Sequence, residues 1–297
     1  MIATPYQIAP LVQIKDEQFD INQTTDYDLL VELSPERLRV VVCQYPHGSI
    51  YWLEDYQMGG FFDDKKAIEW LNVLCQQHTF LGNNQWRKVI VSFNTPHFTL
   101  IPDEFFRKEY THNYLELLRE KIAENEQVLH YGIGKIQARN VFAVNTPMME
   151  WVLNTYTPQA PVFLHQTHGI IENLMQQHID FSKNGVLMHL YFEEGFLTIS
   201  LAKDNKLLYC NKIAYKSAHD MGYFVMFVLD SLQLLPKEIR CELYGEITPY
   251  SEDYQLLQRF LPQLYFGKNP DKIKLGEAFE DLPEHRYCCL YAHFSIG

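Results

Sequence analysis

The sequence predicts an α/β protein in which one structural unit occurs twice, each copy a mixed β-sheet flanked by helices. Three observations lead to this fold class. Short apolar runs bounded by turn residues indicate strands, and apolar residues spaced three and four apart indicate helices. The same order of strands and helices then occurs a second time along the chain. The length of 297 residues agrees with two domains of roughly 150 residues each.

The first copy begins with three short apolar runs, which predict an antiparallel meander. The runs are 29–33, 38–43 and 50–53. A helix is expected over 63–81, where Asp63 or Asp64 can cap its start. The almost continuous apolar run 88–93 predicts a buried central strand. Residues 1–27 are interpreted as an N-terminal arm, either irregular or partly an edge strand.

Additional segments separate the two copies. We expect a long charged helix over 103–124 with a solvated face, a hairpin of 128–131 and 137–144, a helix over 147–156, a strand over 162–165 and a helix over 169–179. A polar turn at 183–185 then marks a boundary. The sequence therefore predicts a first domain over 28–182 and a second over 183–297.

The second copy repeats the order strand–strand–strand–helix–strand–helix. Its predicted elements are strands 186–190, 196–201, 207–210, 238–244 and 263–266, and helices 217–235 and 254–261. By pattern, Leu29 aligns with Val186 and Leu33 with Leu190, and a two-residue insertion in the following turn brings Leu38 onto Leu197. Helices that follow strands indicate that some neighbouring strands are parallel, because a parallel pair needs a crossover.

The helix over 217–235 is apolar nearly all round, which is typical of a core helix. We therefore expect Met226, Phe227 and Leu229 to be buried against the second sheet.

Composition excludes several classes of protein. Hydrophobic residues make up 47% of the chain, so a disordered chain is excluded. The formal net charge of −12 disfavours nucleic acid and anionic membrane surfaces as partners. No apolar run approaches the roughly 20 residues of a membrane span, and the N-terminus lacks the features of a signal peptide. Six cysteines without a C-x-x-C pair indicate reduced, mostly buried thiols, and we expect a cytoplasmic protein.

Two other groups of residues carry side chains that metal binding or nucleophilic catalysis could use. His165 and His168 have the spacing of a chelating pair, but no third ligand lies at zinc spacing, so we predict a polar helix start facing a cleft or solvent, and no metal. Cys288 and Cys289 lie in the apolar run YCCLYAHF, interpreted as a strand with buried thiols. The sequence therefore predicts no catalytic residue.

The predicted order of elements resembles the ribonuclease-H-like fold, and two such units in tandem resemble the actin-like ATPase superfamily. That superfamily includes actin, the Hsp70 ATPase domain, sugar kinases and type IV pilus assembly proteins. The whole chain is similar to a bacterial family known as a domain of unknown function with an actin-like fold. The ending DLPEHRY at 281–287 contributes to this likeness. The resemblance covers about residues 28–297 and implies an actin-like ATPase fold.

The resemblance also implies where a nucleotide would bind. Active members carry an acidic residue at the end of the first strand, which holds Mg²⁺ through water, followed by a glycine-rich turn. Glu32 matches the acidic position and Ser34 offers a hydroxyl, but the turn has no glycine and Pro35 removes a donor. We interpret Glu32 as a solvent-facing turn residue.

The matching positions in the second copy are also degenerate. His189 replaces the acid, and Gly195 is the one glycine of a turn that also carries Glu193 and Glu194. In the late turn that binds adenosine in active members, Gly245 is the one glycine left. We therefore expect no cofactor and no ATP hydrolysis.

Three functional hypotheses remain. The first is a non-enzymatic scaffold or regulatory binding protein with a protein partner. The second is an ATP-binding enzyme or kinase with atypical phosphate loops that uses Mg–ATP. The third is a sensor that binds a small molecule or peptide in the interdomain cleft. The sequence identifies neither the partner nor the oligomeric state.

Overall fold

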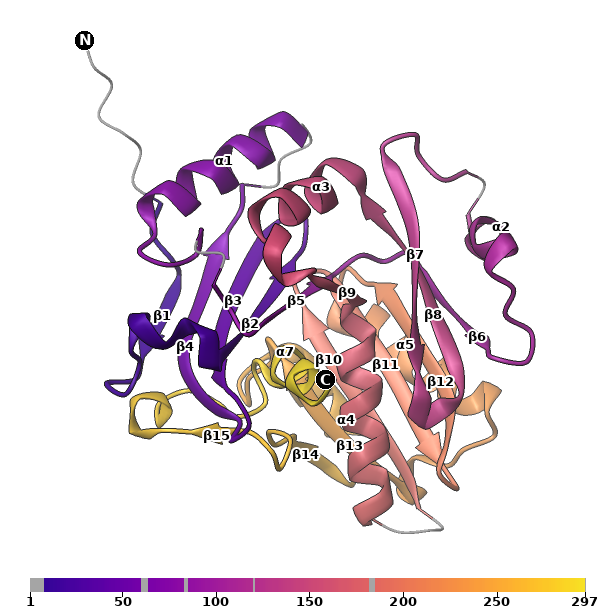
Figure 1. The fold of residues 1–297 in the computed structure, drawn as a ribbon. Helices are drawn as coiled ribbons and strands as arrows, with labels where there is room; N and C mark the ends of the chain where they lie inside the picture. The colour runs from indigo at the N-terminus through magenta and orange to yellow at the C-terminus, as the bar shows by residue number, and fades with distance from the viewer. Residues whose placement is uncertain (1–7, 60–63, 83–84, 120, 182–184, 297) are drawn as a thin grey trace.

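The computed structural model describes residues 8–59, 64–82, 85–119, 121–181 and 185–296. Their strands form a seven-stranded, a five-stranded and a three-stranded sheet. Helices α4 (Gln166–Phe181) and α7 (Cys288–Ala292) pack against each other and lie between the two larger sheets (Figure 1).

The first sheet contains the predicted meander. Its strands are β1 (Val12–Lys15), β2 (Tyr27–Leu33), β3 (Arg37–Gln44), β4 (Ser49–Gln57), β5 (Lys88–Phe93), β9 (Val162–His165) and β15 (Lys274–Leu275). Strands β2, β3 and β4 are antiparallel neighbours, whereas β5 is parallel to β2 and β9 is parallel to β5. Strand β1 adds an antiparallel edge to β4, so part of the expected N-terminal arm is an edge strand.

The second sheet has the same connectivity. Its strands are β10 (Val186–Glu193), β11 (Phe196–Lys203), β12 (Lys206–Ala214), β13 (Ile239–Gly245) and β14 (Leu264–Phe266). Strands β10 to β12 form an antiparallel meander, β13 is parallel to β10, and β14 is parallel to β13. Both sheets thus follow the predicted order of strands and helices.

The pairing registers correct the predicted alignment of the two copies. Leu33 pairs with Leu38 and Phe192 pairs with Leu197, so the paired positions are five residues apart in both copies and there is no two-residue insertion. By these registers Glu32 corresponds to Tyr191, and not to His189. The alignment predicted from the apolar pattern was wrong because side chains alternate along a strand with a period of two. Shifting one strand by two residues in the alignment therefore keeps apolar residues opposite apolar residues.

The segment between the copies forms a small separate sheet beside the second sheet (Figure 1). Strands β7 (Glu126–Ile133) and β8 (Ala138–Asn145) make the predicted hairpin, and β6 (Phe98–Pro102) pairs with β8. The prediction of a long charged helix over 103–124 was wrong. The segment contains a 3-10 turn, Lys108–Tyr110, and the short helix α2, Thr111–Glu116. Its charged composition suits a helix, but α2 buries just Thr111 and Leu115, too few for a longer amphipathic helix.

The other helices follow their predicted positions. They are α1 (Asp64–Gln77), α3 (Thr146–Thr155), α5 (Ala218–Ser231) and α6 (Glu252–Leu257). Asn145 and Ser217 cap α3 and α5 by accepting backbone N–H hydrogen bonds. Asp63, one of the two expected caps of α1, lies outside the described residues, as do residues 183 and 184 of the predicted boundary turn 183–185. The division into domains 28–182 and 183–297 stays a prediction.

Helix α5 is buried along one side. Met221, Val225 and Leu229 lie in the core of the second sheet, and Met226 is half-buried. The prediction for Phe227 was wrong: its side chain is 56% exposed and stacks on Tyr223, with ring centroids 6.0 Å apart. A helix covering one face of a sheet leaves its far side in solvent, even where that side carries aromatic residues.

The end of the chain returns to the first sheet. Strand β15 pairs in parallel with β4, and Tyr287, Leu290 and Tyr291 pack on the apolar face of the first sheet. The run YCCLYAHF, expected to be a strand, forms α7, and Cys288 and Cys289 are both buried in it. A short apolar run fits a buried strand and a buried helix equally well, which explains the difference.

Candidate functional site

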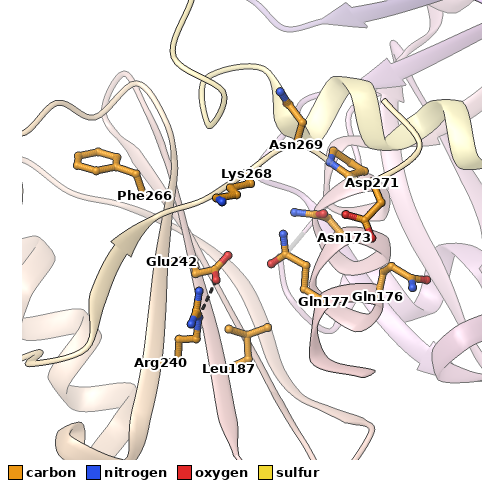
Figure 2. A pocket seen from close by; sticks show the side chains of 11 residues that line it. Asn173, Gln176, Gln177, Leu187, Arg240, Glu242, Phe266, Lys268, Asn269 and Asp271 are labelled. Atoms are coloured by element: carbon orange, nitrogen blue, oxygen red, sulfur yellow. Dashed lines mark hydrogen bonds and ion pairs between the residues drawn. The ribbon is translucent and has the colours of Figure 1, made fainter. Parts of the chain in front are cut away.

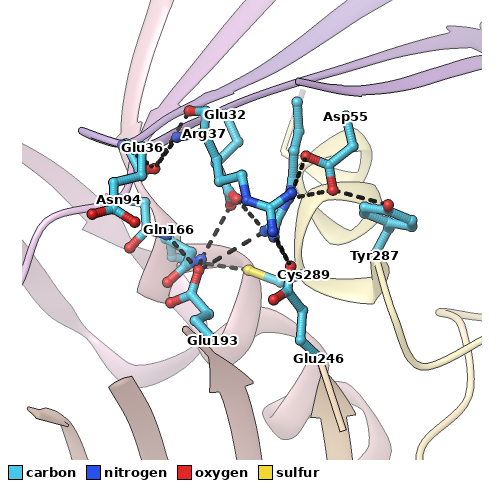
Figure 3. A network of polar contacts seen from close by, with 12 residues as sticks. Glu32, Glu36, Arg37, Asp55, Asn94, Gln166, Glu193, Glu246, Tyr287 and Cys289 are labelled. Carbon is cyan, nitrogen blue, oxygen red and sulfur yellow. Dashed lines mark hydrogen bonds and ion pairs between the residues drawn. The ribbon is translucent and has the colours of Figure 1, made fainter. Parts of the chain in front are cut away.

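The ends of β2 and β10 meet in a cleft between the two large sheets, and a network of charged and carboxamide side chains lies across it (Figure 3). We call this set the cleft network. Its members are Glu32, Arg37, Arg39, Asp55, Asn94, Gln166, Glu193, Lys212 and Glu246. Strands β2, β3, β4 and the residue after β5 supply the side chains of the first copy. The start of α4, strands β10 and β12, and the residue after β13 supply the others.

Arg39 is the centre of one half of the cleft network. Its Nη1 donates to Glu32 Oε1 at 2.8 Å, its Nη2 to Glu246 Oε1 at 2.8 Å, and its Nε to Asp55 Oδ2 at 3.4 Å. The guanidinium is almost fully buried, and this burial opposes its charge. The surrounding anionic groups, Glu32 foremost, nevertheless raise the pKa of Arg39 above its ordinary value. Arg39 therefore stays charged and paired.

Lys212 is the centre of the other half. Its Nζ lies 2.6 Å from Glu193 Oε2 and also donates to Asn94. The other carboxylate oxygen of Glu193 accepts from Gln166 Nε2 at 2.8 Å and from Asn94 Nδ2 at 2.5 Å. Gln166 also donates to Glu32 Oε2 at 3.2 Å, and this joins the two halves.

The two buried carboxylates have opposite pKa shifts. Burial raises the pKa of Glu32, and the attraction of Arg39 offsets this only in part. Burial acts in the same direction on Glu193, but Lys212 and Arg39 together lower the pKa of Glu193 below its ordinary value. The network thus holds the charge of Glu193 firmly and that of Glu32 less firmly.

Several of these contacts cross from one copy to the other. Arg39 on β3 reaches Glu246 after β13, Arg37 lies 3.5 Å from the same carboxylate, and Asn94 after β5 reaches Glu193 at the end of β10. Beside these bridges a cavity of about 270 Å³ remains, lined partly by Pro35 and Glu194. Side chains of the protein itself therefore hold the two copies together across the cleft.

The structure brings two of the sequence-predicted residues to this cleft. Glu32 is 2% exposed and ion-paired, so its interpretation as a solvent-facing turn residue was wrong. Its side chain points into the cleft because it alternates with Val31 and Leu33, which face the core of the first copy. Ser34 lines the remaining cavity, but its Oγ accepts from the backbone N–H of Arg37 at 2.9 Å and so closes the β2–β3 turn.

The two predicted glycines have structural roles. Gly195 has a φ of +72° in the β10–β11 turn, and a Cβ there would meet no atom within 4 Å among the described residues. Gly245 has a φ of +81°, and a Cβ there would lie 2.1 Å from the carbonyl oxygen of Phe192. Gly245 is thus required where β13 closely approaches the end of β10.

His189 lies outside the cleft network, contrary to the position expected for it. Its Nε2 is 2.9 Å from Gln177 Oε1, and its ring packs 4.6 Å from that of Tyr244. Burial lowers the pKa of His189 to about 3, so the imidazole is neutral.

His165 and His168 are both buried. The helix start was predicted to face a cleft or solvent, and Gln166, which lies between them in the sequence, does reach the cleft network. His165 Nε2 donates to the Thr95 carbonyl oxygen at 2.9 Å, and burial lowers the pKa values of His165 and His168 to about 3 and about 4. Within the described ranges, no group of three or more His, Cys, Asp or Glu side chains is arranged to hold a metal ion.

The described helices also include none that is long and apolar enough to span a membrane.

The sequence analysis missed the cations of the cleft network. Arg39 interrupts the predicted apolar run 38–43. A charged residue inside a predicted buried strand is the signal that could have identified it, because such a residue needs a partner. Its partner Asp55 gave no such signal, since it lies in β4 but beyond the predicted run 50–53. Lys212 gave no comparable signal, since β12 is a half-exposed edge strand.

Comparison with solved structures identifies the class of fold as that of the actin-like ATPases. A protein with actin-like ATPase fold and unknown function from Bacteroides thetaiotaomicron matches with a TM-score of 0.77 and 16% identity, over 94% of this chain and 99% of that one. A PilM–PilN type IV pilus biogenesis complex matches with a TM-score of 0.57 and 11% identity, over 90% of this chain and 96% of that one. At these identities the likeness shows the fold alone.

Within this class, residues 16–264 match the family described as "Protein of unknown function (DUF3822)". The match spans most of the chain, so the protein belongs to this family. No curated protein matches the chain.

Proposed function

We propose that this protein is a non-enzymatic scaffold or regulatory binding protein, in which the nucleotide cleft of the actin-like fold is closed by the protein's own ion pairs. The cleft network carries this proposal. Arg39 and Lys212, two cations that a phosphate group would require, are already committed to Glu32, Glu246 and Glu193.

The charge of the cleft further disfavours a nucleotide. Four carboxylates, from Glu32, Asp55, Glu193 and Glu246, face three cations, from Arg37, Arg39 and Lys212. A triphosphate would bring additional negative charge into this excess. The turn after β2 contains Pro35 in place of a backbone donor, so this cleft does not fit Mg–ATP and we assign it no catalytic step.

Two observations support a binding role. One similar structure, the PilM–PilN complex, is an assembly of two proteins. In addition, α5 exposes the stacked rings of Tyr223 and Phe227, which are 64% and 56% exposed, and exposed aromatic residues favour protein contacts. The cysteines of the described residues are free thiols, which agrees with a reducing compartment such as the cytoplasm.

The test is calorimetry and thermal unfolding of the pure protein with Mg–ATP, together with a phosphate-release assay. A nucleotide at 100 times its dissociation constant would stabilise the protein by about 2.7 kcal/mol, and we expect no such shift. The variant Glu193→Gln serves as a matched control, since it removes one anion from the cleft and still cannot supply the missing backbone donors. Micromolar binding together with phosphate release that Glu32→Ala abolishes would establish the alternative, an ATP-binding enzyme with atypical phosphate loops.

A further inference from the structure

The pocket between α4 and the segment that follows β14 has polar walls whose hydrogen bonds are already made within the protein (Figure 2). Gln177 Nε2 donates to Tyr244 Oη at 2.9 Å, and Gln176 Oε1 accepts from Lys135 Nζ at 3.2 Å. A polar ligand would have to displace these hydrogen bonds, so we assign no ligand to this pocket.

A groove lies between the small three-stranded sheet and the second sheet, beside β12 (Figure 1). One section of it, with a volume of about 390 Å³, lies between β6 and β12. A second section of about 550 Å³ shares Leu100 and Leu207 with the first and continues to the β7–β8 and β11–β12 turns. Leu100 and Leu207 also pack on one apolar cluster, so apolar contacts hold the two sheets together beside the groove.

The walls of the section between β6 and β12 are the edges of these strands, and not their faces. Residues 207–211 of β12 all line it, as do residues 98–100 of β6. Side chains alternate between the two faces of a strand, so a cavity over one face would be lined by every second residue. The uninterrupted runs therefore show that the groove follows the backbone of both strands.

Both strands lie at the edge of their sheets. Strand β12 is the last strand on one side of the five-stranded sheet, and β6 is the last strand on one side of the three-stranded sheet. The backbone donors and acceptors of an edge strand can pair with a further strand. On the side of the groove, neither β6 nor β12 pairs with a strand of the described residues.

The hydrogen bonds between β6 and β8 show which backbone groups of β6 are directed toward the free side. In an antiparallel pair, alternate residues direct their N–H and C=O groups away from the partner strand. Asp103 N–H donates to the carbonyl oxygen of Gln137, so the odd-numbered residues of β6 pair with β8. The backbone groups of Phe98 and Leu100 therefore point away from β8.

The same pattern applies to β12. Tyr215 N–H donates to the carbonyl oxygen of Gly195, so the odd-numbered residues from 209 onward pair with β11. The backbone groups of Cys210 and Lys212 therefore point away from β11. The N–H of Lys212 donates to Asn211 Oδ1 at 2.9 Å, so Cys210 is the residue of the groove whose N–H can pair with an added strand.

The side chains of the groove favour an occupant that is both apolar and acidic. Leu118 and Leu208 line it and are 62% and 39% exposed, so they offer apolar surface to a partner. Lys135 and Lys206 are the charged residues of its two sections, and none of the described residues that line them is acidic. Lys135 lies 3.0 Å from Glu172, whereas Lys206 is exposed and forms no ion pair within the described part of the chain.

We propose that this groove binds an extended, acidic segment of a partner protein by strand addition. The segment would form backbone hydrogen bonds with the edges of β6 and β12, and its apolar side chains would cover Leu118 and Leu208. This proposal rests on the proposed function, because it names the kind of segment that the protein partner of the scaffold would present. The groove shares no residue with the cavity of the cleft network.

The experiment selects ligands for the full chain from a phage-displayed library of random short peptides. Selected sequences should be rich in aspartate and glutamate, alternate these with apolar residues, and lack proline, which has no backbone N–H to donate. Synthetic versions should bind in calorimetry with a dissociation constant of about 100 μM or below. A version N-methylated at alternate backbone nitrogens should bind about tenfold more weakly, because it lacks the N–H groups that pair with a strand edge.

Three protein variants locate the bound peptide. Leu118→Ala should weaken its binding about tenfold, the loss expected for one apolar contact. Lys206→Glu should also weaken binding, and added salt should reduce the difference from the parent protein. Leu235→Ala is the matched control, since it truncates a leucine that is 51% exposed and outside the groove, and it should leave binding unchanged. All three side chains are exposed, and the melting temperatures of the variants verify that they fold.

Selection of basic peptides, failure to select any peptide, equal binding by the Leu118→Ala protein, or undiminished binding of the N-methylated peptide would each overturn the proposal. A dimer in sedimentation that Leu118→Ala dissociates would also overturn it, because the groove would then bind a second copy of this chain. Binding and hydrolysis of Mg–ATP in the cleft would instead contradict the proposed function, and would leave the peptide result at this separate groove unchanged.

Discussion

Replacing Arg39 with methionine tests the central claim about the cleft. The substitution keeps much of the side-chain volume but removes a guanidinium that pairs with Glu32, Asp55 and Glu246. Glu32 and Asp55 are 2% and 0% exposed, so solvent cannot take over their hydrogen bonds. Removing one partner of a buried ion pair leaves an uncompensated buried charge, so we expect a loss of about 3–5 kcal/mol in the free energy of unfolding.

The adjacent arginine provides a matched control. Arg37 lies on the same strand and contacts Asp55 and Glu246, but its side chain is 19% exposed and its contacts are longer, at 3.3 and 3.5 Å. Solvent screens such a pair, so Arg37→Met should cost about 1 kcal/mol or less. The contrast between the two variants isolates the effect of burial from that of charge.

A second substitution should restore part of the loss. In Arg39→Met/Glu32→Gln the uncompensated carboxylate is replaced by a neutral amide of similar shape, which should recover about half of the lost stability or more.

The same reasoning predicts that the stability of the Arg39→Met protein depends on pH. Burial already raises the pKa of Glu32, and loss of Arg39 should raise it further. A carboxyl group with a raised folded-state pKa contributes stability that is lost as pH rises, so Arg39→Met should be less impaired near pH 5 than near pH 8.

The assay is denaturant unfolding followed by far-UV and near-UV circular dichroism at both pH values. Equal costs for Arg39→Met and Arg37→Met would contradict the interpretation, as would a loss below about 1 kcal/mol for the Arg39 variant. A loss independent of pH would show that Glu32 is not the carboxylate left uncompensated.

Two further predictions use matched pairs within one element or one class of turn. On α5, Leu229→Ala should lower the free energy of unfolding by about 2–5 kcal/mol, because Leu229 is buried. Phe227→Ala should change it by no more than about 0.5 kcal/mol, because Phe227 is exposed. Equal losses of stability in thermal unfolding would place Phe227 in an interface. Among glycines, Gly195→Ala should cost about 1–2 kcal/mol for its φ of +72°. Gly48→Ala should cost clearly more in the same measurement, since its Cβ would also lie 1.9 Å from the Lys272 carbonyl oxygen; a smaller loss than for Gly195→Ala would refute this contact.

The sequence predicted the elements whose pattern is local. Strand β5 has the predicted bounds of 88–93, and the meanders of both sheets were expected from turn residues between apolar runs. The wrong predictions concern segments whose local pattern fits more than one structure or gives no clear periodicity. The apolar run 287–294 suits a helix as well as a strand, and the segment 103–124 has a helical composition without a buried stripe.

The candidate site was predictable only in part, for a related reason. The family resemblance indicated Glu32 at the end of β2 as a candidate site residue. Its partner Arg39 also binds Glu246, which lies 207 residues further along the chain than Arg39. A contact between residues so far apart in the sequence cannot be predicted from the spacing of neighbouring residues. The alignment of the two copies could not be predicted in this way either, because the strand pairs are needed to show that Glu32 corresponds to Tyr191.

The return of the chain to the first sheet bears on the order in which the protein can fold during synthesis. The face of that sheet formed by Leu30, Val41 and Leu53 is covered by Tyr287 and Leu290, which a ribosome adds after the whole second sheet. A nascent first half therefore exposes an apolar surface until the final segment arrives, and contacts of such long range slow folding. For the same reason, the halves could not be exchanged in evolution as independent modules without also exchanging the segment that covers this face.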